Sequence, residues 1–213
     1  MQIGIVGGTG PAGRGLAVRA ASAGHQVWLG SREAPRASEV AASLRGQGSL
    51  PIEGRSNVDA AHAELVVVAT PWEAVVATVR PLAAALAGKV VVSMVNALVK
   101  QGREMVALFP ARGSMAAELQ ASLPGSSVVA ALHHLPASLM EDLMSGLESD
   151  VLVCGDDADA RAVTCTLIDT MEGLRAIEVG SLAQAGPIEA FTAACITVNM
   201  RHKVHTTVRL GGI

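Results

Sequence analysis

The sequence predicts an α/β fold in which a doubly wound, mainly parallel sheet carries a small C-terminal helical extension. Runs of Val, Leu and Ile without polar alternation recur along the chain, as in strands that are buried on both faces. Ala-rich stretches of helical length separate these runs. Aromatic residues make up only 2% of the chain, so aliphatic side chains must form the core.

The first part of the chain alternates strands and helices in a regular order. We expect strands at 2–6, 25–29, 50–54, 65–69, 89–93 and 127–132. We expect helices between them at 11–23, 35–44, 73–86 and 114–123. Gly88 favours the end of the helix that precedes it, and Ser114 with Glu118 is close to a capping pattern.

The order after residue 137 is less regular. We expect helices at 138–147, 158–171 and 188–200, the last of which runs on towards His205, and strands at 151–154 and 174–179. Asp156 and Asp157 are expected to cap the helix that follows them. We therefore divide the chain into 1–137 and a C-terminal α/β and helical part, 138–213, which packs on the first and need not be a separate domain.

Composition excludes several classes of partner. The net charge is −3 and there is no basic block, so we expect no nucleic acid. The N-terminus runs from a short apolar strand into glycines, unlike a signal peptide, and no apolar run is long enough for a membrane span. Cys154, Cys165 and Cys195 form no CxxC pair, which favours free thiols in a reducing cytoplasm.

A glycine-rich loop follows the first strand directly and opens the first helix. It reads Gly8, Thr9, Gly10, Pro11, Ala12, Gly13, the pattern GxGxxG. We expect Gly8 to permit the tight turn, Gly10 to let a pyrophosphate approach the backbone, and Gly13 to let the helix lie close to the strand. Free N–H groups at the helix start then face the phosphates. A glycine turn without a ligand is the alternative, but the strand–loop–helix context favours a Rossmann domain that binds a dinucleotide.

The end of the second strand predicts which dinucleotide binds. A site for NAD usually carries an acid there, whereas this chain has Ser31 and Arg32, with Arg36 one helical turn further on. Guanidinium groups make charge-assisted bonds to a 2′-phosphate, and two of them favour NADP over NAD by roughly a hundredfold or more. The alternative is that Arg32 and Arg36 are ordinary solvated residues.

The segment Thr70-Pro71-Trp72-Glu73 follows the fourth strand and so lies at the carboxyl edge of the sheet, where ligands bind in open α/β folds. Thr70 and Pro71 are therefore candidates for cofactor contact. Trp72 either packs on the cofactor or closes the core at the start of a helix.

Several short segments occur in an order that resembles one known family. They are Gly-Gly-Thr-Gly at 7–10, Gly-Ser-Arg at 30–32, Pro-Trp-Glu at 71–73, Ala-Leu-His-His-Leu-Pro-Ala at 131–137 and Val-Cys-Gly-Asp-Asp at 153–157. Together they resemble the NADPH-dependent reductases of the deazaflavin coenzyme F420 over nearly the whole chain. The glycine loop is not specific to that family, whereas the other segments are fairly specific in combination.

The resemblance implies an NADP-binding Rossmann domain over 1–137 and hydride transfer between NADP(H) and F420. The nicotinamide C4 would meet the deazaflavin C5, so catalysis would consist mainly of proximity and orientation. By position it implies these NADP contacts: Thr9, Gly10, Pro11, Ala12, Ser31, Arg32, Arg36, Trp72, Asn96 and Ala137. His133 and Pro136 would line the cavity where the two rings meet.

The histidines are the remaining candidates for chemistry. No Cys or carboxylate cluster has ligand spacing with them, so we expect no metal. His133 is the one candidate for a catalytic side chain, which would stabilise charge or donate a proton; a hydrogen-bonded structural histidine is the alternative. Arg201 and Lys203 either attract an anionic tail of the acceptor or form a solvated helix end.

Three functions remain open at this point. They are an NADPH:F420 oxidoreductase, an NADPH-dependent reductase of a flavin, imine or carbonyl, and a non-catalytic NADP-binding protein. The chain departs from the family at 93–96, at His134 and in the basic segment 200–205, which keeps the choice of acceptor open. The apolar helix at 188–200 has no polar face, which favours a homo-oligomer, either a dimer or a tetramer.

Overall fold

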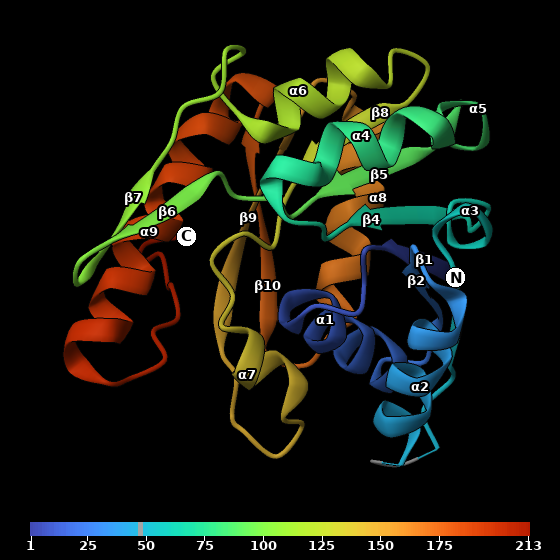
Figure 1. Ribbon diagram of the computed structural model, residues 1–213. Helices are drawn as coiled ribbons and strands as arrows, with labels where there is room; N and C mark the ends of the chain where they lie inside the picture. Colours follow the sequence, from blue (N-terminus) through green and yellow to red (C-terminus); the bar gives the residue numbers. More distant parts are fainter. Residues whose placement is uncertain (47–48) are drawn as a thin grey trace.

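The computed structural model describes residues 1–46 and 49–213. Within them, an eight-stranded sheet runs through the molecule in the order β10-β9-β8-β5-β4-β1-β2-β3 (Figure 1). Its strands are β1 Gln2–Val6, β2 Gln26–Ser31, β3 Ile52–Ser56, β4 Leu65–Val68, β5 Val90–Ser93, β8 Ser127–Ala130, β9 Ser149–Gly155 and β10 Leu174–Gly180.

Helices cover both faces of this sheet. They are α1 Pro11–Ser22, α2 Ala34–Arg45, α3 Asn57–Ala60, α4 Val75–Val79, α5 Ala83–Leu86, α6 Met115–Ser122, α7 Ala137–Glu141, α8 Ala158–Asp169 and α9 Ala185–His202, with the 3-10 turns η1 Trp72–Ala74, η2 Arg80–Leu82 and η3 Leu182–Gln184. One buried apolar cluster joins α1, α2 and α8 to one face, and another joins α4, α6 and α9 to the other. The doubly wound, mainly parallel fold is therefore confirmed.

The strands from β3 across to β8 are all parallel. The register aligns their last residues, because Val6 pairs with Val68, Val68 with Ser93, and Ser93 with Ala130. Their carboxyl ends therefore share one edge, and the loops that carry the predicted site residues leave from it.

β9 reverses direction. It runs antiparallel to β8 and pairs with it only where Val129 and Ala130 lie opposite Gly155 and Cys154. Residues 149–153 therefore project past the carboxyl edge of the parallel strands, and β10 runs parallel beside them. The strand positions in this part were expected, but nothing in an apolar strand sequence encodes its direction.

A two-stranded hairpin, β6 Leu98–Gln101 and β7 Glu104–Ala107, was not expected from the sequence. Gly102 forms its turn in the left-handed conformation, with φ at 59°. The hairpin packs on α9, where Met105 N donates to Thr197 Oγ1 at 2.9 Å.

The single helix expected at 73–86 is wrong, since four short segments, η1, α4, η2 and α5, replace it. Pro81 lies in the middle of this stretch and has no N–H to donate to the preceding turn, which prevents a continuous α-helix.

The helix expected at 138–147 is also wrong, because α7 ends at Glu141. Arg19 of α1 is buried and donates to the carbonyl oxygens of Leu139, Met140 and Asp142 at 2.7 to 3.1 Å. These carbonyl oxygens accept hydrogen bonds from the guanidinium instead of from the N–H groups of a further helical turn. The same hydrogen bonds hold α7 against α1.

Trp28 of β2 lies beneath the guanidinium of Arg55 of β3, whose Cζ is 4.0 Å from the ring centroid. This cation–π contact covers the outer strands of the sheet. None of the described helices is long and apolar enough to cross a membrane. The division of the chain at residue 137 stays a prediction, although β9 and β10 belong to the same sheet as β1.

Candidate functional site

A cavity of about 450 Å³ opens at the carboxyl edge of β1, β2 and β4. It brings together residues from the glycine loop, the end of β2 and the loop after β4. The predicted site residues that line it are Thr9, Gly10, Pro11, Ala12, Ser31, Arg32, Arg36, Thr70 and Pro71.

The glycine turn differs from the expectation in one residue. The left-handed conformation belongs to Gly7, with φ at 72°, so assigning the tight turn to Gly8 was wrong by one position. Gly8 is instead a packing residue, because a Cβ there would lie 2.7 Å from Leu29 Cδ1. A Cβ on Gly13 would lie 2.6 Å from Gly8 Cα, so the close approach of helix and turn is confirmed. Gly10 has open space in front of it, as phosphate binding requires.

Asn57 holds this turn in place, a role that the sequence pattern did not predict. Its Oδ1 accepts a hydrogen bond from Gly7 N at 3.0 Å, and the residue is buried against the cavity. Gly30 makes room for it, because a Cβ there would lie 2.8 Å from Asn57 Oδ1. The signal available was a single Asn after a strand, at the first position of a short helix that Ser56 caps, and this pattern is not distinctive.

The end of β2 presents the two arginines to solvent. Arg32 and Arg36 are exposed at the cavity, and neither forms an ion pair with any described residue. Ser31 is buried, and its Oγ accepts from Glu33 N at 3.2 Å. Glu33 also lines the cavity, which the sequence analysis did not anticipate.

Thr70 supplies a polar atom with no protein partner. Its Oγ1 is buried in the cavity wall and has no hydrogen bond within the described residues. A buried hydroxyl without a partner is unfavourable, so a ligand group at this position would stabilise it. The cavity thus offers helix-start N–H groups, two guanidiniums and one hydroxyl that have no partner among the described residues, and this set of donors suits a phosphorylated dinucleotide.

A small cavity of about 50 Å³ adjoins the first, and Ala12 lines both. The predicted residues Asn96, His133 and Ala137 line it. Asn96 Nδ2 donates to His133 O at 3.0 Å, and Asn96 Oδ1 is left buried without a described partner. Pro136 is buried at the start of α7 beside this group.

His133 is neutral at this position. Burial, with the neighbouring His134 adding to it, lowers the pKa of His133 to about 3. Neither ring nitrogen has a hydrogen-bond partner in the described part of the chain. The ring therefore offers one N–H and one lone pair to a ligand, rather than a positive charge.

Trp72 lies apart from the cofactor cavity. It is half-buried and lines a separate, mostly apolar cavity with Val76, Leu108 and Phe109. Its position fits the alternative that this residue closes the core at the start of a helix, since it packs against the apolar cluster under α4.

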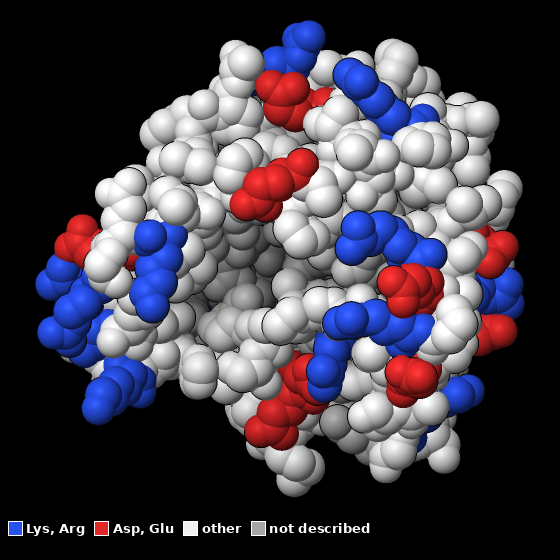
Figure 2. All heavy atoms as spheres, in the orientation of Figure 1, with Lys and Arg blue, Asp and Glu red and all other residues white. Residues whose placement is uncertain are grey.

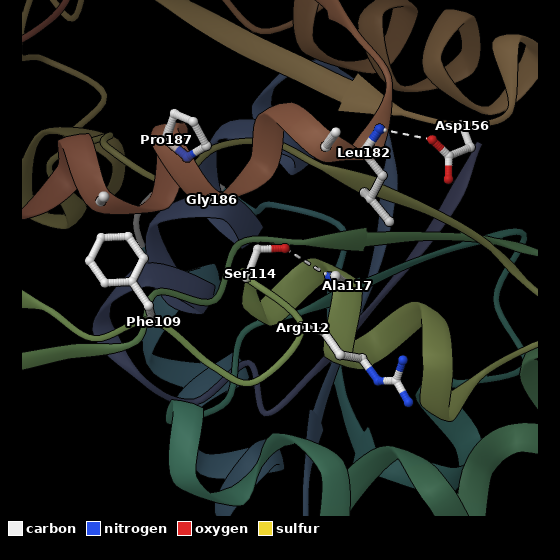
Figure 3. A pocket seen from close by; sticks show the side chains of 11 residues that line it. Phe109, Arg112, Ser114, Ala117, Asp156, Leu182, Gly186 and Pro187 are labelled. Atoms are coloured by element: carbon white, nitrogen blue, oxygen red, sulfur yellow. Dashed lines mark hydrogen bonds between the residues drawn. The ribbon is translucent and has the colours of Figure 1, made fainter.

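A larger cavity of about 580 Å³ lies between the start of α6 and the start of α9 (Figure 3). Phe109 and Pro187 face each other across it, and Asp156 accepts a hydrogen bond from Leu182 N at 3.0 Å at its far side. None of the predicted site residues lines this cavity, so it is distinct from the site at the carboxyl edge.

The face shown in Figure 2 is hollowed at its centre, and uncharged residues line most of the hollow. Lys and Arg gather on the side that α9 and the β6–β7 hairpin occupy in Figure 1. An uncharged hollow beside the cofactor edge suits a flat, largely apolar ring better than a small charged substrate.

Comparisons with known proteins agree with this geometry. A family model described as NADP oxidoreductase, coenzyme F420-dependent, matches residues 2–97. The F420-dependent NADP reductase of Methanocaldococcus jannaschii is 36% identical over 211 residues, which cover 95% of this chain and 94% of that protein. The protein of the same name from Methanothermobacter thermautotrophicus is 34% identical over 214 residues, which cover 96% and 91%.

A solved structure extends the likeness to three dimensions. A crystal structure from an Arthrobacter species, assigned as an F420-dependent NADP reductase, superposes with a TM-score of 0.81 at 28% identity and covers 99% of both chains. Because relatives above 30% identity match nearly their whole length and that of this chain, the chain belongs to the family of F420-dependent NADP reductases.

Proposed function

We propose that this protein transfers a hydride between NADP(H) and the deazaflavin coenzyme F420. The observation that carries the proposal is the cavity in which a glycine turn meets two exposed arginines at neighbouring strand ends, neither of them ion-paired within residues 1–46 and 49–213. The family to which the chain belongs supports F420 as the second substrate.

The residues present fit NADP(H). Gly10 leaves the backbone open to a pyrophosphate, and Arg32 with Arg36 would bind the 2′-phosphate through charge-assisted bonds. Ser31 and Thr70 would add hydroxyl groups to the same ligand. When bound, NADP(H) supplies the transferable hydride at the nicotinamide C4. The protein's contribution is to hold the dinucleotide and to exclude water from the edge where the acceptor enters.

His133 and Asn96 would serve the acceptor side. Asn96 Oδ1 and the ring nitrogens of His133 are buried beside the glycine loop and have no hydrogen-bond partner in the part of the chain that the structure describes. These atoms would form hydrogen bonds with the nicotinamide carboxamide or with the edge of the deazaflavin ring, and would so orient the two bound substrates. A neutral His133 offers one N–H at neutral pH, and we propose that this donor orients the ligand.

The test is to mix the purified protein with NADPH and F420, and separately with FMN, an imine or a carbonyl compound. Loss of the oxidised deazaflavin absorbance is the expected result, with no turnover of the other acceptors. Turnover of FMN, imine or carbonyl alone would assign a different reductase. Tight NADPH binding without turnover of any acceptor would instead indicate a non-catalytic NADP-binding protein.

We also propose that the protein is a cytoplasmic homodimer that associates through α9. Phe191 and Val198 of α9 are 43% and 40% exposed, and Phe109 beside the start of α9 is 73% exposed. Apolar side chains exposed together favour association. Light scattering is expected to give twice the mass of one chain, and Phe191→Glu should shift it to the mass of a monomer.

A further inference from the structure

The projecting part of β9 is covered by the end of the chain. We call residues 203–213 the C-terminal tail. Asp150 N donates to Val208 O at 2.7 Å, and Val208 N donates to Ser149 Oγ at 3.2 Å. The tail therefore lies along the strand edge that β8 does not reach, and it satisfies backbone groups that would otherwise be open.

The Asp150 carboxylate fixes this arrangement. It is fully buried and accepts from Arg175 Nε at 2.8 Å, Arg175 Nη2 at 2.7 Å and Arg209 Nη1 at 3.2 Å. Leu210 N donates to the same carboxylate at 2.6 Å. These partners, Arg175 foremost, hold the pKa of Asp150 well below its ordinary value, so the group stays ionised. One strand, its neighbour and the tail thus meet at one carboxylate.

The backbone of Asp150 connects this cluster to the site. His134 Nε2 donates to Asp150 O at 2.8 Å, and the bond requires the proton to be on Nε2. The His134 ring also packs edge-on against Phe191 of α9, with 6.5 Å between the ring centroids. His134 is buried, and burial lowers its pKa, so it is held as a neutral ring between the tail cluster and α9.

The turn that carries both histidines is strained. Leu132 adopts the left-handed conformation, with φ at 68°, although it is a bulky residue and fully buried. Such a backbone is unfavourable for a residue other than glycine and persists only where its surroundings impose it. The contacts that impose it are Asn96 to His133 O on one side and His134 to Asp150 O on the other.

We propose that His134 is a positioning residue: anchored by Asp150 and the C-terminal tail, it holds the strained turn and so keeps His133 in the cavity beside the glycine loop. The rate measurements for this proposal rest on the proposed F420 reductase activity. The proposal assigns to the tail, which is far from the glycine loop in sequence, a role in the geometry of the acceptor side.

A matched pair of variants separates positioning from packing. His134→Leu keeps apolar contact with Phe191 but loses the donor, whereas His134→Gln keeps an N–H at nearly the same reach. In single-turnover reduction of F420 by NADPH, we expect His134→Leu to be about tenfold slower, the equivalent of one lost buried hydrogen bond, and His134→Gln to recover most of the rate. The Kd for NADPH should stay within about twofold in both, since one hydrogen bond at the acceptor side leaves the phosphate contacts intact.

A second pair tests the tail. Arg209→Ala removes one partner of Asp150 and is expected to slow hydride transfer as His134→Leu does. Glu178→Gln breaks an ion pair of β10 from its exposed side, since Glu178 accepts a hydrogen bond from Arg161 Nε at 2.8 Å, and it leaves the bond from Arg161 to Gly155 O in place. No described contact joins this pair to His134, so the rate should stay unchanged. Equal rates in His134→Leu and wild type, or equal slowing in both members of either pair, would overturn the proposal.

A readout that needs no acceptor keeps this test separate from the proposed function. In ring-nitrogen NMR spectra of the full chain, His134 is expected as the Nε2–H tautomer. The His133 ring signals should shift in His134→Leu and return towards wild type in His134→Gln. If the wild type does not reduce F420, the proposed function fails while these spectra still decide the positioning role. An Nδ1–H tautomer at His134, or an unmoved His133, would contradict the inference.

Discussion

The cofactor edge and the C-terminal part of the molecule place their charged groups in opposite ways. At the cofactor edge, Arg32 and Arg36 are exposed and without a described carboxylate partner. In the C-terminal part, Asp150 and Glu189 are 0% and 5% exposed, and every carboxylate oxygen receives a hydrogen bond. Changes at the first should therefore alter ligand affinity, and changes at the second should alter stability and its dependence on pH.

The two buried carboxylates also differ from each other. Asp150 faces guanidinium groups, which lower its pKa, whereas the described partners of Glu189 of α9 are two backbone donors, Met115 N and Ala116 N, at 2.8 and 3.0 Å. Two backbone donors at the start of α6 do not offset the loss of hydration, so burial raises the pKa of Glu189 to about 7. The charge of its partners thus decides whether the pKa of a buried carboxylate lies below or above its ordinary value.

The largest effect is expected from Asp150→Ala. Removing the carboxylate breaks the contacts of two arginines and of the tail at a fully buried position, and should lower the free energy of unfolding by about 3–5 kcal/mol. Urea unfolding measures the change. Glu104→Gln, which breaks the exposed pair with Arg201, is the control and should cost less than about 1 kcal/mol. Similar losses in the two variants would contradict the comparison.

Glu189 should give the next largest effect, as a slope of stability with pH. Its pKa is about 7 when folded and 4.5 in the ordinary state, so between these values the folded protein retains a proton that the unfolded chain releases. Stability should therefore fall as the pH rises through this window, by at most about 3 kcal/mol. Urea unfolding from pH 5 to pH 8 measures the slope, and Glu189→Gln should remove it.

Asp150 should give a dependence of stability on pH of the opposite sign. Because the pKa of Asp150 is lowered in the folded protein, its contribution to stability is fully present above the pKa of an ordinary Asp. That contribution is lost as the pH falls towards the lowered pKa of the folded state. If the free energy of unfolding stayed constant from pH 5 to pH 8 in both wild type and Glu189→Gln, the predicted difference between the two carboxylates would be wrong.

Arg32→Glu should act on affinity and leave stability nearly unchanged. The carboxylate places like charge beside the 2′-phosphate, so the Kd for NADPH should rise about a hundredfold while the Kd for NADH changes little. Calorimetry measures both. Arg45→Glu, which makes the same change of charge at the far end of α2, should affect neither. Equal losses for the two cofactors would remove Arg32 from the 2′-phosphate site.

Asn57→Asp should give the smallest effect. It keeps an oxygen to accept from Gly7 N but replaces the amide donor by a negative charge at the cavity wall. We expect about tenfold weaker NADPH binding, or 1.4 kcal/mol, with NADH less affected. Asn57→Ala also releases the turn and should weaken both cofactors alike. Unchanged NADPH affinity in Asn57→Asp would limit Asn57 to a structural contact outside the ligand's reach.

Much of the cofactor half was predictable because its signals are local. A strand, a GxGxxG loop and a helix are contiguous in sequence, and Gly13 is required by its contact with Gly8, only five residues away. Ser31 and Arg32 follow from position alone, since they end β2 beside that loop. Even here the turn lay one residue earlier than expected, at Gly7, because the pattern does not encode φ.

The C-terminal half was less predictable because long-range partners shape it. The reversal of β9 depends on a sheet edge that no strand sequence records. α7 stops early because Arg19, more than a hundred residues away, takes its carbonyls. In the sequence, Asp150 is an ordinary acidic residue before a predicted strand. Its carboxylate becomes the centre of a hydrogen-bond cluster only because Arg209 and Leu210 of the C-terminal tail bind it.

The scarcity of aromatic residues gives the protein two built-in optical reporters. The chain has no Tyr, so emission under ultraviolet excitation comes from two Trp. Trp28, covered by Arg55, lies on the outer strands and reports on the sheet, while Trp72, the first residue of η1, reports on the loop after β4. Replacing each in turn by Phe would let quenching on dinucleotide addition and loss of signal on denaturation be followed separately, without any attached dye.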